Sequence, residues 1–315
     1  MKTKAVQWRR IWRSACFILL AAASCFAFVS NRFFYVSHQR FPLLADLQWT
    51  PAAVAKETIA PMIIGHRGSG LPLLGTHAGR RPALIGNTRH AIANAVESGA
   101  DWIEIDIRKS ADPGGDLVVF HDETLAAKTD GIGRVEERRM EYLKSRQIRV
   151  EWFQSQPEHI LSLDEVFTEF HADKRRWILD VKVTGIRDEL IATLEQHHID
   201  KDRVILFGQE HILREFRTDD YRLGCTTLFR NHADMMVSPT DTLRRCRDSS
   251  IDLLVVPVVF VTPTLASVAE RFDVEVWSYD TNDTRDLDYC VGCGVRGLIV
   301  DNPQRVKTHF RMSGR

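Results

Sequence analysis

The stretch TRHAIANAVESGADWIEIDI, residues 88–107, decides the fold class of this chain. In its first half, apolar residues recur at spacings of three and four, which predicts a helix over 88–98. Its second half alternates Ile with acidic residues, which is the period of a β-strand and predicts one over 102–107. A helix that leads into a strand in this way is typical of α/β proteins.

The same alternation continues along the chain from residue 61. Further helical patterns lie at 162–172, 188–198 and 263–272. The strand-like stretches are 62–65, 102–107, 117–121, 177–182, 204–207, 223–228, 253–259, 274–279 and 297–300. Nine candidates over about 240 residues favour a (β/α)8 TIM-like barrel with one spare strand over an open sheet, and the pattern does not identify the spare one.

Two stretches interrupt the alternation. Residues 69–86 are rich in Gly and Pro and too long for a simple strand-to-helix turn, so we interpret them as a flap over one end of the barrel. Residues 122–161 follow the third strand-like stretch and hold a turn-rich TDGIGR and a charged run. We interpret this second stretch as a small inserted subdomain.

Length and charge restrict the class of protein. The 315 residues suit one large domain with additional segments, because single cores stop growing at about 250–300 residues. Lys plus Arg and Asp plus Glu both number 42, so the chain as a whole gives no electrostatic argument for a nucleic acid partner.

The first 58 residues differ from the rest. Residues 1–13 are basic without an acid, and residues 14–32 hold a charge-free run from Ser14 to Ser30. As a helix, this run is roughly 25 Å long, just enough to span a membrane with snorkelling arginines at its ends. We expect either a retained anchor with a cytoplasmic N-terminus or a cleaved signal sequence. With an anchor, residues 33–58 would connect the membrane to a barrel of residues 59–310 on the periplasmic or extracellular side. With a cleaved signal sequence, the barrel would be secreted.

Polar side chains gather at the ends of the predicted strands, where (β/α)8 barrels carry their active residues. In order along the chain they are His66, Arg67, Glu104, Asp106, His121, Asp122, Asp180, Lys182, Trp277 and Asp301. Asp122 is either part of the site or a cap of the loop that follows, and Asp301 is either a partner of a site residue or a helix cap before Pro303. So many polar groups at one rim predict a catalytic or binding site there.

Three of these side chains predict a metal site. Strand alternation puts Glu104 and Asp106 on one face, opposite the isoleucines of the same strand. Two buried carboxylates repel each other unless a cation lies between them. With Asp180 they form an oxygen-rich set suited to Ca²⁺ or Mg²⁺, although a salt bridge of the first two with a neighbouring Arg is the alternative.

The remaining residues suggest chemistry on a phosphate ester. His66 and His121 would transfer protons, and Arg67 and Lys182 would supply fixed positive charge for a phosphate. Trp277 is either an apolar wall for a glycerol or acyl group or plain core. A metal site, two proton-transferring histidines and two cationic side chains for a phosphate together indicate phosphoester hydrolysis.

Sequence motifs over roughly residues 61–303 resemble the glycerophosphodiester phosphodiesterase family. They are IIGHRGSG, NTRHAIANAVESGADWIEIDI, GDLVVFHDETL, TDGIG, LSLDEVF, ILDVK, VEVWSYD and GLIVDNP. The resemblance implies a TIM-like barrel that hydrolyses glycerol-linked phosphodiesters to glycerol phosphate and an alcohol. It assigns the metal to Glu104, Asp106 and Asp180, and general acid and base catalysis to His66 and His121.

Two positions depart from the family pattern. Gly86 stands before Asn87 and Thr88, where the family usually has Glu, and Asp180 stands where the family commonly has Glu. One alternative is therefore a degenerate member that binds phosphodiesters or lipid head groups without cutting them. Another keeps the catalysis and acts on a lysophospholipid, which a membrane anchor would make accessible.

Overall fold

The computed structural model describes residues 60–70, 85–148, 158–170, 175–226, 239–279 and 282–312. The predicted basic segment 1–13, the segment 14–32, the connector 33–58 and most of the predicted flap lie outside these residues. Among the residues that are described, no helix has the length and apolar character needed to cross a bilayer.

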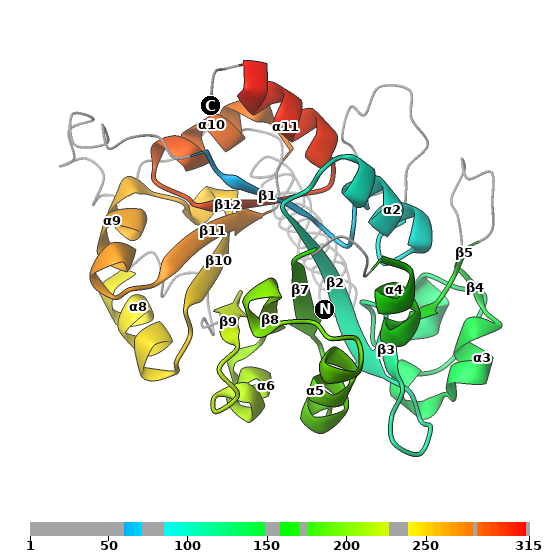
Figure 1. The fold of residues 1–315 in the computed structure, drawn as a ribbon. Helices are drawn as coiled ribbons and strands as arrows, with labels where there is room; N and C mark the ends of the chain where they lie inside the picture. Colours follow the sequence, from blue (N-terminus) through cyan, green and yellow to red (C-terminus); the bar gives the residue numbers. More distant parts are fainter. Residues whose placement is uncertain are drawn as a thin grey trace, which may run out of the picture. The chain divides into compact units, whose positions relative to one another are not determined.

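Eight parallel strands form a closed barrel, which confirms the predicted TIM-like fold (Figure 1). Neighbouring strands pair in parallel all the way round, and β1 pairs with both β2 and β12, which closes the ring. The barrel strands are β1 (Met62–Gly65), β2 (Trp102–Lys109), β7 (Trp177–Val181), β8 (Val204–Gly208), β9 (Arg222–Cys225), β10 (Leu253–Pro257), β11 (Glu275–Tyr279) and β12 (Gly297–Val300).

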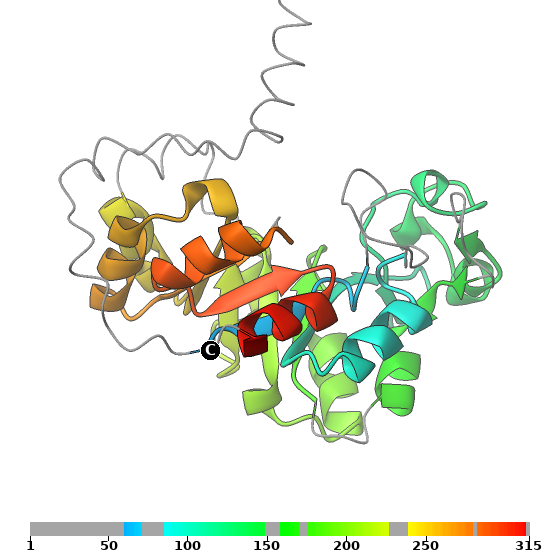
Figure 2. The same ribbon diagram turned by 90° about the horizontal axis from the view of Figure 1, so that it is seen from above.

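Helices surround the barrel, in the connections between its strands and after the last strand (Figures 1 and 2). They are α2 (Arg89–Glu97), α4 (Leu163–Phe170), α5 (Arg187–Gln196), α6 (Glu210–Leu213), α8 (Pro239–Asp248), α9 (Pro263–Arg271), α10 (Thr284–Gly292) and α11 (Pro303–Met312). Local sequence sets several helix starts. Thr88 caps α2 by accepting from the Ala91 amide, and Thr262 caps α9 just before Pro263.

The helix-to-strand turns share one backbone feature. In six of them, a residue between the helix and the next barrel strand has a positive φ: Gly99, His198, Asp220, Ser250, Asp273 and Gly294. Left-handed residues commonly end helices because they turn the chain and satisfy the last carbonyls. This repeated turn returns each helix to the amino-terminal end of the barrel, so the opposite end is left to the longer loops.

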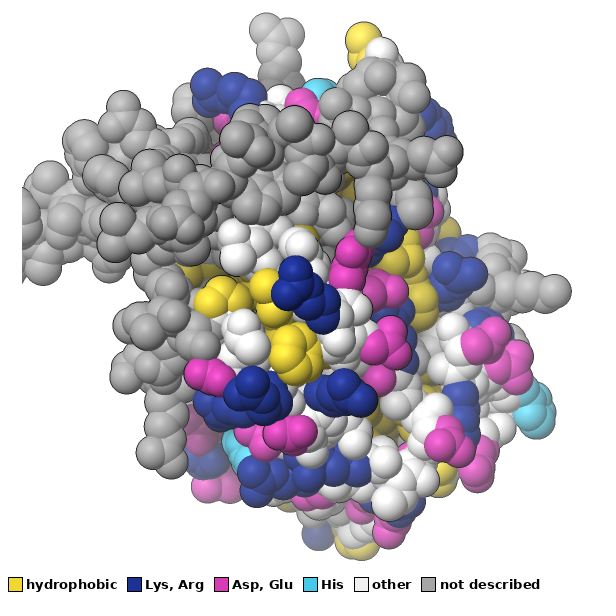
Figure 3. All heavy atoms as spheres, turned by 90° about the vertical axis from the view of Figure 1, so that its left-hand side faces the viewer, with side chains coloured by type: hydrophobic (Ala, Val, Ile, Leu, Met, Phe, Trp, Pro, Cys, Tyr) yellow, Lys and Arg dark blue, Asp and Glu magenta, His cyan; other side chains and the backbone are white. Residues whose placement is uncertain are grey.

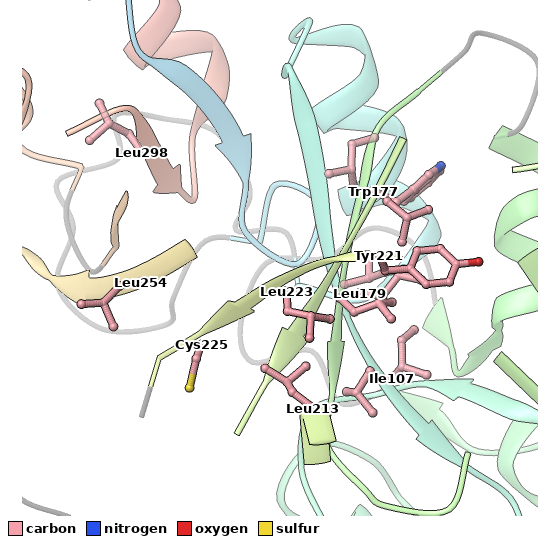
Figure 4. Packing of buried hydrophobic residues seen from close by; sticks show 14 of the residues in the cluster. Ile107, Trp177, Leu179, Leu213, Tyr221, Leu223, Cys225, Leu254 and Leu298 are labelled. Atoms are coloured by element: carbon pink, nitrogen blue, oxygen red, sulfur yellow. The ribbon is translucent and has the colours of Figure 1, made fainter. Parts of the chain in front are cut away.

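The core has two layers. Strand residues pack with the surrounding helices in the outer layer, where Ile103, Ile105 and Ile107 of β2 lie and where Figure 4 shows Ile107, Leu179 and Leu213. The second layer consists of strand residues alone, Trp102 among them, and fills the barrel interior. Odd-numbered residues of β2 therefore face the helices, and Glu104 and Asp106 face inward as the alternation predicted.

The spare strand is β3 (Leu117–Val119), which lies outside the barrel. It pairs antiparallel with β2, and β6 (Leu161–Ser162) pairs antiparallel with β3. The predicted insertion follows it and contains the short helix α3 (Met140–Lys144), the 3-10 turns Leu125–Ala127 and Val135–Glu137, and a ribbon of β4 (Gln147–Ile148) and β5 (Glu158–His159). A separate apolar cluster that includes Leu125, Val135 and Leu143 packs this region.

Acidic and basic side chains are interspersed on the face that carries α8 and α9 (Figure 3). On α8, for example, Arg244 Nη1 lies 2.6 Å from Asp241 Oδ1. Charges of both signs therefore lie side by side on the described part of this face.

Candidate active site

A tight turn at the end of β1 places His66 and Arg67 at the carboxyl end of the barrel. The turn has positive φ at Arg67 and Gly68, and a Cβ on Gly65 would lie 2.1 Å from the Gly68 carbonyl oxygen. The Arg67 amide donates to Glu104 Oε2 at 2.6 Å, which fixes the turn to β2. The two glycines are therefore needed to place two polar residues directly after a buried strand.

The three predicted carboxylates come together. Asp106 and Asp180 are opposite each other in the register of β2 and β7, and Glu104 is one inward position before Asp106. An oxygen of each lies within 4.8 Å of the others, and the cluster is buried. The structure thus brings together the residues predicted to bind metal.

Two cationic side chains contact this cluster. Lys182 Nζ lies 2.8 Å from Asp106 Oδ1 and 2.5 Å from Asp180 Oδ2. Arg67 Nε lies 3.1 Å from Asp106 Oδ2. Asp106 is therefore paired on both oxygens, whereas Glu104 has no cationic partner at salt-bridge distance among the described residues.

The carboxyl groups differ in pKa as a result. Burial and the neighbouring Asp106 charge raise the pKa of Glu104 to about 7. Burial also raises the pKa of Asp180, although Lys182 opposes it. Burial acts in the same direction on Asp106, but Lys182 and Arg67 outweigh it and hold the pKa of Asp106 well below its usual range.

This donor set fits a hard divalent cation. Its ligand atoms are carboxylate oxygens, the type that Ca²⁺ and Mg²⁺ prefer. Three carboxyl groups face two cationic side chains here, and burial raises the pKa of Glu104 and Asp180. A cation there would supply the missing positive charge.

His66 is held by a chain of hydrogen bonds. Its Nδ1 lies 2.8 Å from Asp301 Oδ1, directly after β12. Asn282 Nδ2 donates to the other oxygen of Asp301 at 2.9 Å, and Asn282 Oδ1 accepts from the Asp301 amide. This arrangement leaves His66 Nε2 as the ring nitrogen available for substrate.

His121 reaches the site by a different route from the predicted one. It follows β3 rather than a barrel strand, and the Phe120 amide donates to the Asp106 carbonyl at 3.1 Å. Because β2 is longer than its neighbours and β3 runs back along it, the end of β3 returns to the carboxylates. His121 Nδ1 lies 2.6 Å from Asp122 Oδ1, a second histidine–carboxylate pair.

The two histidines have opposite pKa shifts. Burial alone would lower the pKa of His66, but the hydrogen bond to Asp301 and the Glu104 charge outweigh it and raise the pKa. Burial lowers the pKa of His121 by more than the Asp106 charge raises it. At neutral pH, His66 therefore favours the protonated form relative to His121.

Trp277 lies elsewhere, so the prediction that it stands at a strand end is wrong. It is the middle residue of β11, pairs with the first residue of β12, and is fully buried. Its ring packs edge-to-face against Trp102 in the barrel interior, and its Nε1 donates to Glu275. Strand alternation predicts that the Trp277 side chain points into the barrel, but it does not predict how far along the barrel axis the residue lies.

Sequence reasoning missed Asn87. Its Nδ2 donates to Asp106 Oδ2 at 2.6 Å, and its Oδ1 accepts from the Asp106 amide at 3.1 Å. Its φ is +62°, a conformation that Asn adopts more readily than most residues. The sequence feature that could have pointed to Asn87 is its position directly before Thr88, the residue that caps a helix.

The protein is a closed (β/α)8 barrel whose carboxyl end holds buried carboxylates, two histidine–carboxylate pairs and two cationic side chains. These groups are the ones that a TIM-barrel phosphoester hydrolase requires. Comparison with known proteins is more specific. The chain belongs to the glycerophosphoryl diester phosphodiesterase family, whose model matches residues 66–305.

Relatives agree with this membership. A glycerophosphodiester phosphodiesterase from Caldanaerobacter subterraneus subsp. tengcongensis is 26% identical over 247 residues, which cover 76% of this chain and 97% of the relative. A solved structure from Agrobacterium tumefaciens, assigned to the same enzymes, superposes with a TM-score of 0.67 at 17% identity, covering 81% and 99% of the two chains. The solved structure of an Oleispira antarctica phosphodiesterase in complex with the product sn-glycerol-3-phosphate superposes with a TM-score of 0.63 at 22% identity. The match covers 80% of this chain and 97% of the other.

Proposed function

We propose that this protein hydrolyses glycerophosphodiesters to glycerol phosphate and an alcohol, with a divalent cation, Ca²⁺ or Mg²⁺, and two histidines. The observation that carries the proposal is the convergence of Glu104, Asp106 and Asp180 with His66 and His121 at one end of the barrel. Membership in the family and the names of its relatives support the reaction class.

Glu104, Asp106 and Asp180 would hold the cation. When bound, it neutralises charge on the phosphate oxygens and so favours attack at phosphorus. Arg67 would bind a phosphate oxygen, because its guanidinium lies beside the carboxylates and offers further donors. Lys182 keeps two of the carboxylates paired and adds positive charge at the same place.

The directions of the pKa shifts support one assignment of the proton transfers. His121, with its lowered pKa, is the base that removes a proton from the attacking oxygen. His66, with its raised pKa, is the acid that protonates the departing alcohol. Asp301 and Asp122 orient the two rings through Nδ1. The attacking oxygen is either water or the adjacent glycerol hydroxyl, which would give a cyclic intermediate.

The test measures alcohol release from glycerophosphocholine and from a lysophospholipid by the purified full-length protein. Each substrate is tested with Ca²⁺, Mg²⁺ or chelator. We expect turnover that requires a cation and is lost in His66→Ala and His121→Ala but kept in His309→Ala, a histidine of α11 paired with Asp288. Unchanged turnover in His121→Ala would refute its role. Phosphodiester binding without turnover under every cation would instead indicate a binding protein.

We also propose a location for this activity. The basic residues 1–13 and the charge-free run after them support a retained anchor that leaves the barrel on the periplasmic or extracellular side, with a cleaved signal as the alternative. A barrel tethered in this way would have access to lysophospholipids. Sodium carbonate extraction of membranes and protease protection of the barrel in intact cells test this placement.

A further inference from the structure

Gly86 lies in contact with two parts of the β1 turn. A Cβ at Gly86 would be 2.6 Å from Arg67 Cβ and 3.0 Å from Arg67 Cδ. A Cβ at Gly70 would be 2.5 Å from Gly86 Cα. Real Cβ atoms do not approach other atoms this closely, so even an alanine at position 86 requires Arg67 or the turn to move.

The backbone of Arg67 is held on both sides of the residue. Its amide donates to Glu104, and its carbonyl accepts from the Asn87 amide at 2.9 Å. Its side chain lies across Gly86 and ends with Nε 3.1 Å from Asp106 Oδ2. The direction of the guanidinium therefore depends on the missing side chain at position 86.

Asp106 is shared by several partners. It belongs to the carboxylate cluster suited to a cation, and it also pairs with Arg67 and Lys182. Arg67 Nε is buried and makes no hydrogen bond of good geometry with Asp106 or any other described group. The Arg67 side chain nevertheless keeps 29% of its surface exposed. Its guanidinium has further N–H donors besides Nε, which can serve a phosphate oxygen.

We propose that Gly86 is a positioning residue that keeps Arg67 on Asp106 and so couples the cation site to the phosphate site. This inference rests on the proposed function of the same site. A larger side chain at position 86, such as Glu, does not fit against Arg67 in this position.

The coupling predicts two effects of opposite sign when Arg67 is displaced. Asp106 loses one of its positive partners and becomes a stronger ligand for a cation. The phosphate loses a charge-assisted hydrogen-bond donor and binds more weakly. General damage to the site would weaken both kinds of binding, so opposite signs separate positioning from mere structural support.

The experiment measures dissociation constants by calorimetry for full-length protein, first for Ca²⁺ and Mg²⁺ and then for sn-glycerol-3-phosphate with cation present. For Gly86→Ala we expect cation binding to become about 3- to 10-fold tighter and glycerol phosphate binding about 10-fold weaker or more. Gly292→Ala is the matched control, because nothing lies within 4 Å of its added Cβ, and it should change neither constant.

A double-mutant cycle with Arg67→Met tests the mechanism. Arg67→Met alone should tighten cation binding, and adding Gly86→Ala should then have no further effect. Loss of both affinities in Gly86→Ala, or an equal effect of Gly86→Ala with and without Arg67, overturns the proposal. If Gly86→Ala does not fold, unchanged cation affinity in Arg67→Met overturns it. Wild-type protein that binds no cation would refute the proposed cation site itself.

Discussion

His66 Nδ1 and Asp301 Oδ1 lie 2.8 Å apart, although 235 residues separate them in the sequence. The contact joins the first and last strands of the barrel at their carboxyl ends, where β1 and β12 pair. Asp301 therefore sets both the tautomer and the charge of the proposed acid.

The variant Asp301→Asn should lose turnover with little change in KM. The amide no longer favours the protonated ring, so the pKa of His66 falls and the acid is less available at neutral pH. We expect kcat to fall by about 10²-fold or more, the contribution typical of a general acid. Steady-state kinetics and NMR titration of His66 measure the two effects. Asp288→Asn, which alters the Asp288–His309 pair on α10 and α11, should leave both unchanged.

Lys182→Met should destabilise the cation-free protein strongly. The substitution removes the shared partner of Asp106 and Asp180 and leaves buried charge uncompensated, which typically costs about 3–5 kcal/mol. Saturating Ca²⁺ or Mg²⁺ should recover part of the loss. Urea unfolding with and without cation measures both. Lys307→Met, which breaks a pair with Asp101, should cost about 1 kcal/mol or less and show no cation recovery.

The cation-free protein should lose stability as pH rises through the range from about 4.5 to 7. Glu104 has a pKa of about 7 in the folded protein and the ordinary 4.5 when unfolded. The folded state thus binds more protons in this window, so its stability decreases with pH. Relative to Glu104→Gln, the wild type should lose on the order of 3 kcal/mol between pH 5 and pH 8 in chelator. A pH-independent difference between the two proteins would contradict the raised pKa.

Trp277→Phe should affect stability and not substrate binding. Its ring fills the barrel interior beside Trp102, and a Cβ on Gly297 would lie 2.4 Å from it, so the packing is tight. We expect a loss of about 2 kcal/mol in the free energy of unfolding and an unchanged KM. A raised KM at unchanged stability would return Trp277 to the substrate site.

The sequence predicted the barrel and most of the site because both depend on local alternation. Period-two patterns showed which residues of β2 point inward, and turn glycines marked the position of His66 and Arg67. Parallel strands that end at one rim then brought Glu104, Asp106 and Asp180 together.

Local patterns do not determine what depends on pairing between distant segments. The stretch 117–121 has the composition of a strand, but composition does not show that it runs antiparallel outside the barrel. Asn87 and Asp301 act through partners 19 and 235 residues away. The sequence placed Asp301 at the rim, but its pairing with His66 and the whole role of Asn87 appear only in three dimensions. The segments before residue 59 stay predictions.

The inserted region that follows β3 and His121 has its own small apolar core, separate from the two layers of the barrel. Cooperative units that pack separately can open separately. If the region around Leu125 and Leu143 loosens before the barrel melts and His121, the proposed base, moves with it, catalysis would have two stability limits, with the lower one set by this small core. Inactivation by mild denaturant would precede unfolding, and the enzyme would regain activity as soon as that region re-formed.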